Sequence, residues 1–338
     1  MRYVTFALPD SLRKPRLGAS RDDLVVDLKA ARTWAQGARA LPAQPIPPTL
    51  LELIHLGPEA HDYLTELVAS LDGVDPLELR GAGREAVAHQ VSDVVLFPPL
   101  PRPMSLRDFY AFEAHVKAGY AIRGRDVPQV WYELPVFYFS NPSAIYGPEE
   151  SIPYPGYSEA LDYELEVACV IGTRGRDITV EQAEEHIFGY TIFNDWSARD
   201  EQRKEMTVGL GPAKGKDFAS SLGPAIVTPD ELTDRATERP GVYELSMVAR
   251  VNRIERSRGN WKEIHYSFGE MIARASAAVY LMPGDVIGSG TVGTGSLLEL
   301  TGGKGPWLQE GDSVELEIER LGILRNRVGA RANRSSSA

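Results

Sequence analysis

Asp162-Tyr-Glu-Leu-Glu166 is the stretch around which the fold can be organised, because Glu164 and Glu166 alternate with apolar residues in a run that is typical of a β-strand. Side chains two positions apart on a strand point to the same face, so the two carboxylates would project side by side. Two adjacent negative charges cost free energy unless a divalent cation, a shared proton or a basic partner neutralises them. The alternative is a solvent-facing strand with acidic alternation. Further carboxylates in apolar surroundings would favour a neutralised pair over a solvent-facing strand.

Composition excludes several classes of function. The 338 residues include 36 Lys and Arg against 47 Asp and Glu, which gives a formal net charge of −11. No long basic stripe interrupts this charge, which argues against nucleic acid or a membrane surface as a partner but allows a small anionic substrate. No long apolar run or leader is present, and Cys169 is the single cysteine, so a soluble protein in a reducing cytoplasm is expected.

The N-terminal third is expected to form an accessory unit. We predict a small domain with a Pro-rich linker at residues 1–100, a main domain at 101–328 and a disordered polar tail at 329–338. The predicted elements of the small domain are two strands and two helices, at residues 2–8, 23–28, 49–56 and 58–71. Nothing in this region gathers reactive side chains.

A stretch just after the linker places an acid and a histidine in apolar surroundings. Residues 105–119 read as one helix, with Ser105 as its N-cap and Gly119 as its stop. At 100° per residue, Asp108 and His115 would share one face of this helix. A histidine on an apolar face is most often a satisfied core residue, and the aligned Asp108 adds a functional alternative.

A second stretch places a carboxylate at a strand end. Residues 188–196 read as a strand with Asp195 near its end, and a helix begins at about Ser197. Arg199 and Gln202 would lie three positions apart on that helix and offer donors to an anion beside the strand end. The alternative is that Asp195 caps the helix and Arg199 pairs with a surface acid.

Two glycine-rich segments resemble nucleotide-binding motifs without matching them. Residues 209–217 lack the spacing and the hydroxyl of a phosphate-binding loop, so we interpret them as a tight loop that delivers Lys216 to a cleft. Residues 288–293 match G-x-G-x-x-G, but we expect a strand at 295–300 where a dinucleotide fingerprint opens a helix. This segment supplies close backbone approach, the Thr291 hydroxyl and the partly buried acid Glu299.

Taken together, these segments resemble the fumarylacetoacetate hydrolase family over residues 100 to 328. The resemblance implies an α+β fold that is mostly β, with a mixed β-roll catalytic domain behind a smaller N-terminal domain, and a homodimer. The motifs that carry it occur in the family's order and are Asp108-Phe-Tyr-Ala-Phe-Glu-Ala-His115, Asp162-Tyr-Glu-Leu-Glu166, Phe193-Asn-Asp-Trp-Ser-Ala-Arg-Asp200, Gly215-Lys-Asp-Phe218 and Gly288-Ser-Gly-Thr-Val-Gly-Thr-Gly-Ser-Leu-Leu-Glu299.

The resemblance also implies a role for each candidate residue. A divalent cation, commonly Mg²⁺, Mn²⁺ or Ca²⁺, would be held by Asp108, Glu164, Glu166 and Asp195. The catalytic groups would be the base His115, its orienting acid Glu299, and the charge-stabilising Arg199, Gln202 and Lys216. The substrate contacts would be Tyr110, Tyr138 and Thr291.

The chemistry implied is hydrolysis of a carbon–carbon bond in a 1,3-diketo acid, an acylpyruvate or a fumarylacetoacetate-like substrate. The N-terminal part and the residues after Tyr138 depart from the family's fumarylacetoacetases, which puts fumarylacetoacetate itself in question and leaves the metal site intact. The alternatives are an isomerase, hydratase, dehydratase or decarboxylase of 2-keto acids on the same metal site, and a non-catalytic metal-binding or ligand-sensing protein. The His115–Glu299 pair favours hydrolysis, because the resemblance associates it with water activation. A nicotinamide dehydrogenase rests only on the pattern at Gly288.

Overall fold

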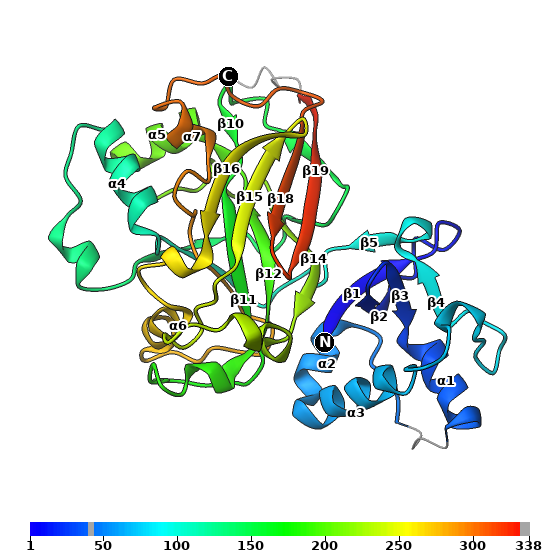
Figure 1. Ribbon diagram of the computed structural model, residues 1–338. Helices are drawn as coiled ribbons and strands as arrows, with labels where there is room; N and C mark the ends of the chain where they lie inside the picture. Colours follow the sequence, from blue (N-terminus) through cyan, green and yellow to red (C-terminus); the bar gives the residue numbers. More distant parts are fainter. Residues whose placement is uncertain (40–43, 332–338) are drawn as a thin grey trace.

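The computed structural model describes residues 1–39 and 44–331, and two sheets dominate it (Figure 1). Two strands pair beside the path of the larger sheet, β5 (Val95–Phe97) with β1 and β8 (Ile145–Tyr146) with β14. The path itself runs, in spatial order, through β4 (Ala88–Gln90), β3 (Leu24–Asp27), β2 (Arg16–Arg21), β1 (Arg2–Ala7), β14 (Ser220–Val227), β12 (Ile187–Asp195), β11 (Leu165–Ile171), β17 (Val286–Gly288), β6 (Leu106–Phe109) and β7 (Phe137–Ser140).

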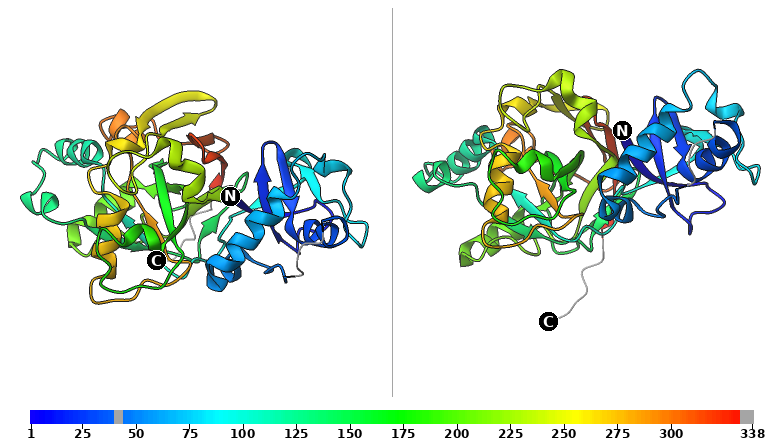
Figure 2. Two further views of the ribbon diagram at one scale, coloured as in Figure 1. Left: turned by 60° about the horizontal axis from the view of Figure 1, so that its bottom comes forward. Right: turned by 90° about the horizontal axis from the view of Figure 1, so that it is seen from below.

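The smaller sheet lies in front of β11 and β12 in Figure 1. Seen from below in the right-hand view of Figure 2, the strands of the main body curve around a common core. A short pair, β10 (Leu161–Asp162) and β13 (Ser197–Ala198), lies near the site. The smaller sheet consists of β16 (Ile254–Asn260), β15 (Ser246–Val251), β18 (Ser313–Ile318), β19 (Gly322–Arg331) and β9 (Ser151–Tyr154).

Helices are few in the described part of the chain, so the prediction of an α+β fold that is mostly β is confirmed. The α-helices are α1 (Leu28–Ala38), α2 (Leu50–Leu56), α3 (Pro58–Ala69), α4 (Glu113–Ile122), α5 (Arg199–Val208), α6 (Phe268–Ser276) and α7 (Leu297–Leu300). None of the helices in residues 1–39 and 44–331 has the length and apolarity that a membrane crossing requires.

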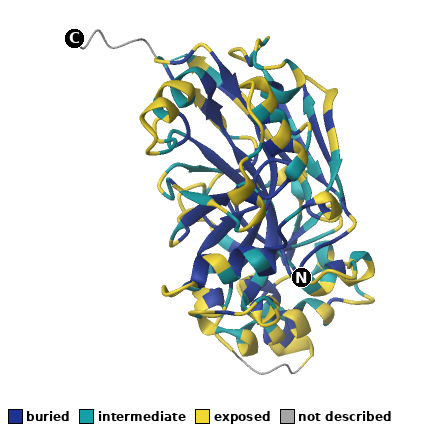
Figure 3. Cartoon of the chain, turned by 90° about the vertical axis from the view of Figure 1, so that its left-hand side faces the viewer, coloured by how far each residue is buried: buried dark blue, intermediate teal, exposed yellow. Residues whose placement is uncertain are grey.

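Strand β11 is buried on both faces, as Figure 3 shows for the middle of the molecule. Val167, Cys169 and Ile171 join the core between the two sheets, whereas Ala168 and Val170 join the core shared with the N-terminal helices. Alternate residues of a strand face opposite sides, so one strand contributes to both cores. Cys169, the single cysteine, is buried on this strand and forms no disulfide.

The N-terminal strands continue the sheet of the main body. β1 pairs antiparallel with β14, with Arg2 opposite Val227 and Tyr3 opposite Ile226. The predicted strands and helices of this region are present as β1, β3, α2 and α3. The proposed domain boundary near residue 100 stays a prediction.

Three sequence predictions are wrong. Residues 105–119 are not one helix, because residues 106–109 form β6 between β17 and β7, and α4 begins only at Glu113. Residues 295–300 are not a strand, because the Ser296 hydroxyl accepts a hydrogen bond from the Glu299 amide and caps the single turn α7. The tail does not begin at Gly329, since β19 continues to Arg331; the rest of the predicted tail lies outside the described residues.

Strand β17 passes between β11 and β6, and a glycine makes room there. A Cβ atom on Gly288 would lie 2.5 Å from Oδ1 of Asp108 and 2.7 Å from the ring of Phe193. In contrast, a Cβ atom on Gly37 in α1 would meet nothing within 4 Å. Gly288 is therefore required by packing, and Gly37 is not.

We expect Gly288→Ala to lower the free energy of unfolding by about 2 kcal/mol or more, because the methyl group overpacks the sheet. Gly37→Ala is the matched control and should raise it by about 0.5–1 kcal/mol, since alanine favours a helix over glycine. Urea unfolding of both variants beside the wild type tests this. Equal stability of the two variants would contradict the packing argument.

Candidate metal centre and active site

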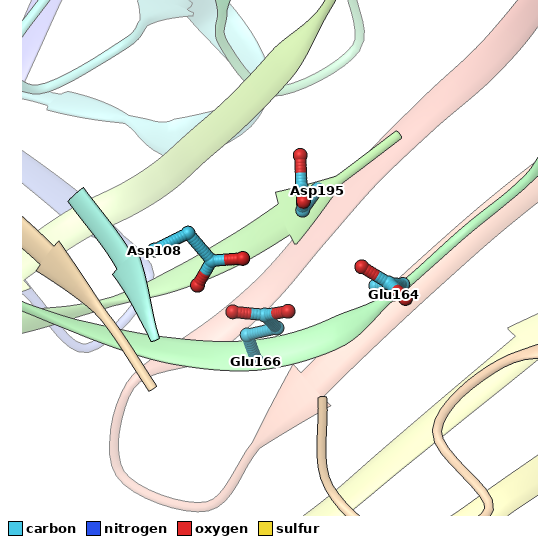
Figure 4. Close-up of side chains that lie close together, drawn as sticks. All are labelled: Asp108, Glu164, Glu166 and Asp195. Atoms are coloured by element: carbon cyan, nitrogen blue, oxygen red, sulfur yellow. The ribbon is translucent and has the colours of Figure 1, made fainter. Parts of the chain in front are cut away.

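Four buried carboxylates converge at one end of the larger sheet (Figure 4). Asp108 comes from β6, Glu166 from β11 and Asp195 from the end of β12, while Glu164 directly precedes β11. One oxygen of each carboxylate lies within 4.8 Å of the corresponding oxygens of the other three. The side-by-side projection predicted for Glu164 and Glu166 is thus present, on the buried side rather than toward solvent.

The cluster is held together by the sheet itself. Leu165 faces Asn194 in the β11–β12 ladder, so the next residues along, Glu164 and Asp195, are neighbours at the strand ends. Asp108 reaches the cluster across Gly288, its register partner in β17, and accepts a hydrogen bond from the Gly290 amide at 3.2 Å.

Two buried basic side chains balance part of this negative charge. Arg199, at the start of α5, donates from Nη2 to Oε1 of Glu164 at 2.8 Å. Lys216 donates from Nζ to Oδ2 of Asp195 at 2.5 Å and also to Glu164. Tyr138 donates its hydroxyl proton to the same oxygen of Asp195 at 2.5 Å. The alternative that Arg199 pairs with a surface acid is therefore excluded.

The four carboxylates differ in the pKa that this environment gives them. Burial alone would raise the pKa of Glu164, but Arg199 and Lys216 together lower it well below its ordinary value. Burial and the neighbouring negative charges raise the pKa of Asp108 and of Glu166 well above their ordinary values. Among the described residues, the ion pairs of Arg199 and Lys216 within the cluster go to Glu164 and Asp195 and not to Asp108 or Glu166.

The donor set fits a divalent cation. Oε2 of Glu166 and Oδ1 of Asp195 are buried, and neither has a hydrogen-bond partner among the described residues. Buried carboxylate oxygens without a partner are costly in a protein, and oxygen atoms are the ligands that Mg²⁺, Mn²⁺ and Ca²⁺ prefer. The residues that would hold the cation are the four predicted ones.

A histidine–glutamate pair stands next to the cluster. His115 on α4 lies with Nδ1 2.5 Å from Oε1 of Glu299 on α7. Its other ring nitrogen, Nε2, lies 3.8 Å from Oε1 of Glu164. Tyr110 packs edge-on against the imidazole, with ring centroids 5.3 Å apart. The imidazole is thus fixed by Glu299 on one side and faces the carboxylate cluster on the other.

The proximity of Asp108 and His115 was predicted for the wrong reason. The two residues do not share a helix face, since Asp108 is in β6 and His115 in α4. The chain turns at 110–112 between the two elements, and this turn brings both side chains to one site.

The remaining predicted residues also lie at this site. Arg199 donates from Nη1 to Oε1 of Gln202 at 3.1 Å. The Thr291 hydroxyl lies 3.3 Å from Oε1 of Glu166. The donors of Arg199 and Lys216 are thus engaged by carboxylates and by Gln202. Their predicted action on a substrate anion stays a prediction.

Asp162 is an organising residue that sequence reasoning did not single out. Its carboxylate is fully buried and accepts from the amides of Leu297 and Leu298 at 2.8 and 3.0 Å, at the start of α7. It also accepts from Nε of Arg199 at 2.8 Å. Asp162 therefore links the helix that carries Glu299 to the arginine that neutralises Glu164. The sequence feature that could have identified Asp162 is its place in the acidic stretch, beside the two glutamates.

Comparison with known proteins identifies relatives over most of the chain. Residues 105–329 match the family described as "Fumarylacetoacetate (FAA) hydrolase C-terminal". A fumarylacetoacetase from Arabidopsis thaliana is 29% identical, over 90% of this chain and 87% of the relative. A mitochondrial oxaloacetate tautomerase from Bos taurus is 30% identical, over 97% of this chain and 91% of the relative.

Solved structures show the same fold. A fumarylacetoacetate hydrolase from Exiguobacterium antarcticum covers 98% of this chain and all of its own, with a TM-score of 0.68 and 28% identity. A maleylpyruvate hydrolase from Sphingobium sp. SYK-6, solved in complex with manganese(II) and pyruvate, covers the same shares with a TM-score of 0.66 and 22% identity. At that identity the second structure is evidence for the fold alone.

We expect Glu166→Gln and Asp195→Asn each to weaken Mn²⁺ binding by about 100-fold or more, because even groups that only orient metal ligands are typically worth 10–100-fold. Titration calorimetry of chelator-stripped protein measures this. Asp234→Asn, which changes an exposed acid paired with Arg320, is the control and should bind as the wild type does. An unchanged affinity in both cluster variants would show that the cation binds elsewhere.

The Mn²⁺ affinity should also rise with pH. Because burial and neighbouring negative charge raise the pKa values of Asp108 and Glu166, these groups take up protons at a higher pH than ordinary carboxyl groups do, and protons compete with the cation for them. We therefore expect weaker binding at about pH 5.5 than at about pH 7.5, with protons released on binding. Calorimetry in buffers of different ionisation enthalpy measures the release. Binding without proton release would contradict this description of the cluster.

Proposed function

Because the chain belongs to the fumarylacetoacetate hydrolase family, we propose that it is a metal-dependent hydrolase that cleaves a carbon–carbon bond in a 1,3-diketo acid. The substrate class proposed is an acylpyruvate or a fumarylacetoacetate-like acid. The observation that carries the proposal is the His115–Glu299 pair, whose free imidazole nitrogen faces the carboxylate cluster. A base held in this position can take a proton from a water molecule beside a bound substrate.

The histidine acts as a general base in this proposal. With Nδ1 bonded to the Glu299 carboxylate, the neutral imidazole keeps its proton on Nδ1 and leaves the lone pair of Nε2 free. Glu299 also stabilises the imidazolium that forms when Nε2 accepts a proton from water, as the third member of a catalytic triad does. The hydroxide then attacks the carbonyl carbon remote from the substrate's carboxylate, and the tetrahedral adduct collapses to a carboxylic acid as the carbon–carbon bond breaks. The electron pair of that bond stays on the departing keto-acid fragment as an enolate, which takes up the proton from the His115 imidazolium.

A divalent cation on Asp108, Glu164, Glu166 and Asp195 would supply Lewis acidity toward the keto or enol oxygen of the substrate. Mg²⁺, Mn²⁺ and Ca²⁺ all prefer oxygen ligands and therefore suit four carboxylates. We place the charge-stabilising role on Arg199, Lys216 and Gln202, a role in which the loss of one donor costs about 100-fold or more in rate.

Three further side chains are proposed to contact the substrate. Tyr110 lies against His115, Tyr138 against Asp195 and Thr291 against Glu166. Each of the three therefore lies beside the base or beside a carboxylate of the cluster. The homodimer and the cytoplasmic location stay predictions from the sequence.

Tautomerisation of a 2-keto acid is the second candidate. The oxaloacetate tautomerase of Bos taurus is as similar to this chain as the fumarylacetoacetase of Arabidopsis thaliana, and over a larger share of it. The same base beside the same cluster can move a proton between carbon and oxygen of an enolised substrate without activating water. The products distinguish the two reactions, since hydrolysis splits the substrate into two fragments, one of them a newly formed carboxylic acid, whereas tautomerisation leaves the carbon skeleton intact.

We expect chelator-stripped protein to cleave acylpyruvates only after addition of Mg²⁺ or Mn²⁺, with release of pyruvate and a carboxylic acid. His115→Ala and Glu299→Gln should each lower kcat by about 100-fold or more, because general-base catalysis is typically worth that factor. Loss of enol absorbance beside product analysis follows the reaction. His186→Ala, a change of a half-buried histidine bonded to the Thr173 carbonyl, is the matched control.

Metal-dependent loss of oxaloacetate enol without cleavage of any acylpyruvate would replace the hydrolase proposal with the tautomerase. Cleavage that persists in His115→Ala would remove the general base from the mechanism. Pyruvate release without Mg²⁺ or Mn²⁺ would show that the reaction does not depend on a cation at the carboxylate cluster.

A further inference from the structure

A glutamate on α5 holds the loop that carries Lys216, and no step described above uses it. The Glu205 carboxylate accepts hydrogen bonds from three successive backbone amides, those of Ala213, Lys214 and Gly215, at 2.8, 2.6 and 3.1 Å. Lys216 is the next residue along the chain, and its ammonium group is buried in the cluster. One carboxylate thus fixes the main chain directly before the buried lysine.

The position of Glu205 on its helix needs an explanation. It lies in the second half of α5, where the partial negative charge of the helix end disfavours an acid. Burial would raise its pKa, but the three amide hydrogen bonds lower it below its ordinary value. The side chain is therefore ionised and bound to the loop, which compensates for its unfavourable place on the helix.

The loop packs closely against the same helix face. Arg199, Gln202 and Glu205 are spaced three residues apart on α5, so they form one stripe. A Cβ atom on Gly215 would lie 2.8 Å from the backbone of Gln202, and the Gly215 carbonyl accepts from the Ala198 amide at 2.8 Å. Helix α5 thus presents Arg199 to the cluster directly and Lys216 through the loop.

Lys216 depends on the path of this loop, because its ammonium group reaches both Glu164 and Asp195 from there. The earlier part of the loop is not held by packing in this way. Gly209 and Gly211 have positive φ angles, and Leu210 is 94% exposed. A tether on the three amides limits where the Lys216 side chain can begin.

We propose that Glu205 is a positioning residue that acts through the backbone of residues 213–215 to hold Lys216 against the carboxylate cluster. Its effect on structure follows from the hydrogen bonds alone, and its effect on rate rests on the function proposed above. The experiment therefore has one arm that needs no catalysis and one that does.

The first arm compares wild type, Glu205→Gln and the control Glu201→Gln, which changes an acid of the same helix that pairs with exposed Lys204. Hydrogen exchange read by mass spectrometry should show amides 213–215 exchanging about tenfold faster in Glu205→Gln and unchanged in Glu201→Gln. Acetylation of Lys216, read by peptide mapping, should rise in Glu205→Gln only. Equal exchange and equal acetylation in all three proteins would overturn the proposal, whatever the activity.

The second arm is a double-mutant cycle with Lys216→Met. Glu205→Gln should lower kcat for acylpyruvate cleavage by about 10-fold to 100-fold with little change in KM, since a misplaced charge-stabilising group acts on the transition state. In the Lys216→Met background the same change should cost less than about twofold, because the lysine it positions is gone. Equal losses in both backgrounds would overturn the proposal, because a general loss of structure is additive.

If wild-type protein cleaves no acylpyruvate, the proposed function fails while the exchange and acetylation results still decide the role of Glu205. Glu205→Asp is a second variant that keeps the charge on a shorter side chain. It should protect amides 213–215 better than Glu205→Gln does, and the reverse order would count against an ionic tether.

Discussion

Burial of four carboxylates within 4.8 Å of one another is the constraint on which the rest of the site depends. An ionised carboxylate loses its hydration when it is buried, and like charges at this distance raise one another's pKa. Arg199 and Lys216 compensate for part of the charge, chiefly that of Glu164. Asp108 and Glu166 form no ion pair with a basic side chain among the described residues, and their pKa values are raised, so a divalent cation would relieve the remaining repulsion.

The fold meets this constraint by placing the charges on strands of the sheet, or, for Glu164, on the residue directly before one. The period of a strand places Glu164 and Glu166 on one side of the chain, and the β11–β12 register adds Asp195. Gly288 in the intervening strand β17 has no side chain, so Asp108 reaches the others from β6. Strands buried on both faces cannot shift by one residue without turning core side chains into the wrong layer, so the relative positions of the four oxygens are fixed by packing.

The sequence predicted which residues form this site better than it predicted which strands and helices carry them. Strand alternation at residues 162–166 was enough to place two carboxylates side by side, and the ordered motifs identified the rest. Asp108 and His115 were assigned to one helix because a helical period fits residues 105–119, yet β6 is stabilised by pairing on both sides with strands distant in sequence. Local patterns contain no information about such partners.

Asp162 and Glu205 were missed for a related reason. Both bind backbone amides, and the residue types in a sequence do not reveal which amide a side chain binds. Their partners can be seen only once the chain is folded.

The arrangement also separates two kinds of element by their role. Three of the four carboxylates stand on the sheet and Glu164 directly precedes it, whereas His115, Glu299 and Arg199 come from α4, α7 and α5, and Lys216 comes from the loop after α5. Asp162 links two of these elements, because it binds both Arg199 and the start of α7. A change in one helix can therefore move the imidazole relative to the cluster while the four carboxylates stay in place. In the function proposed above, such a movement would decide whether the imidazole addresses a water molecule or a carbon-bound proton of the substrate, so one fold can serve either reaction.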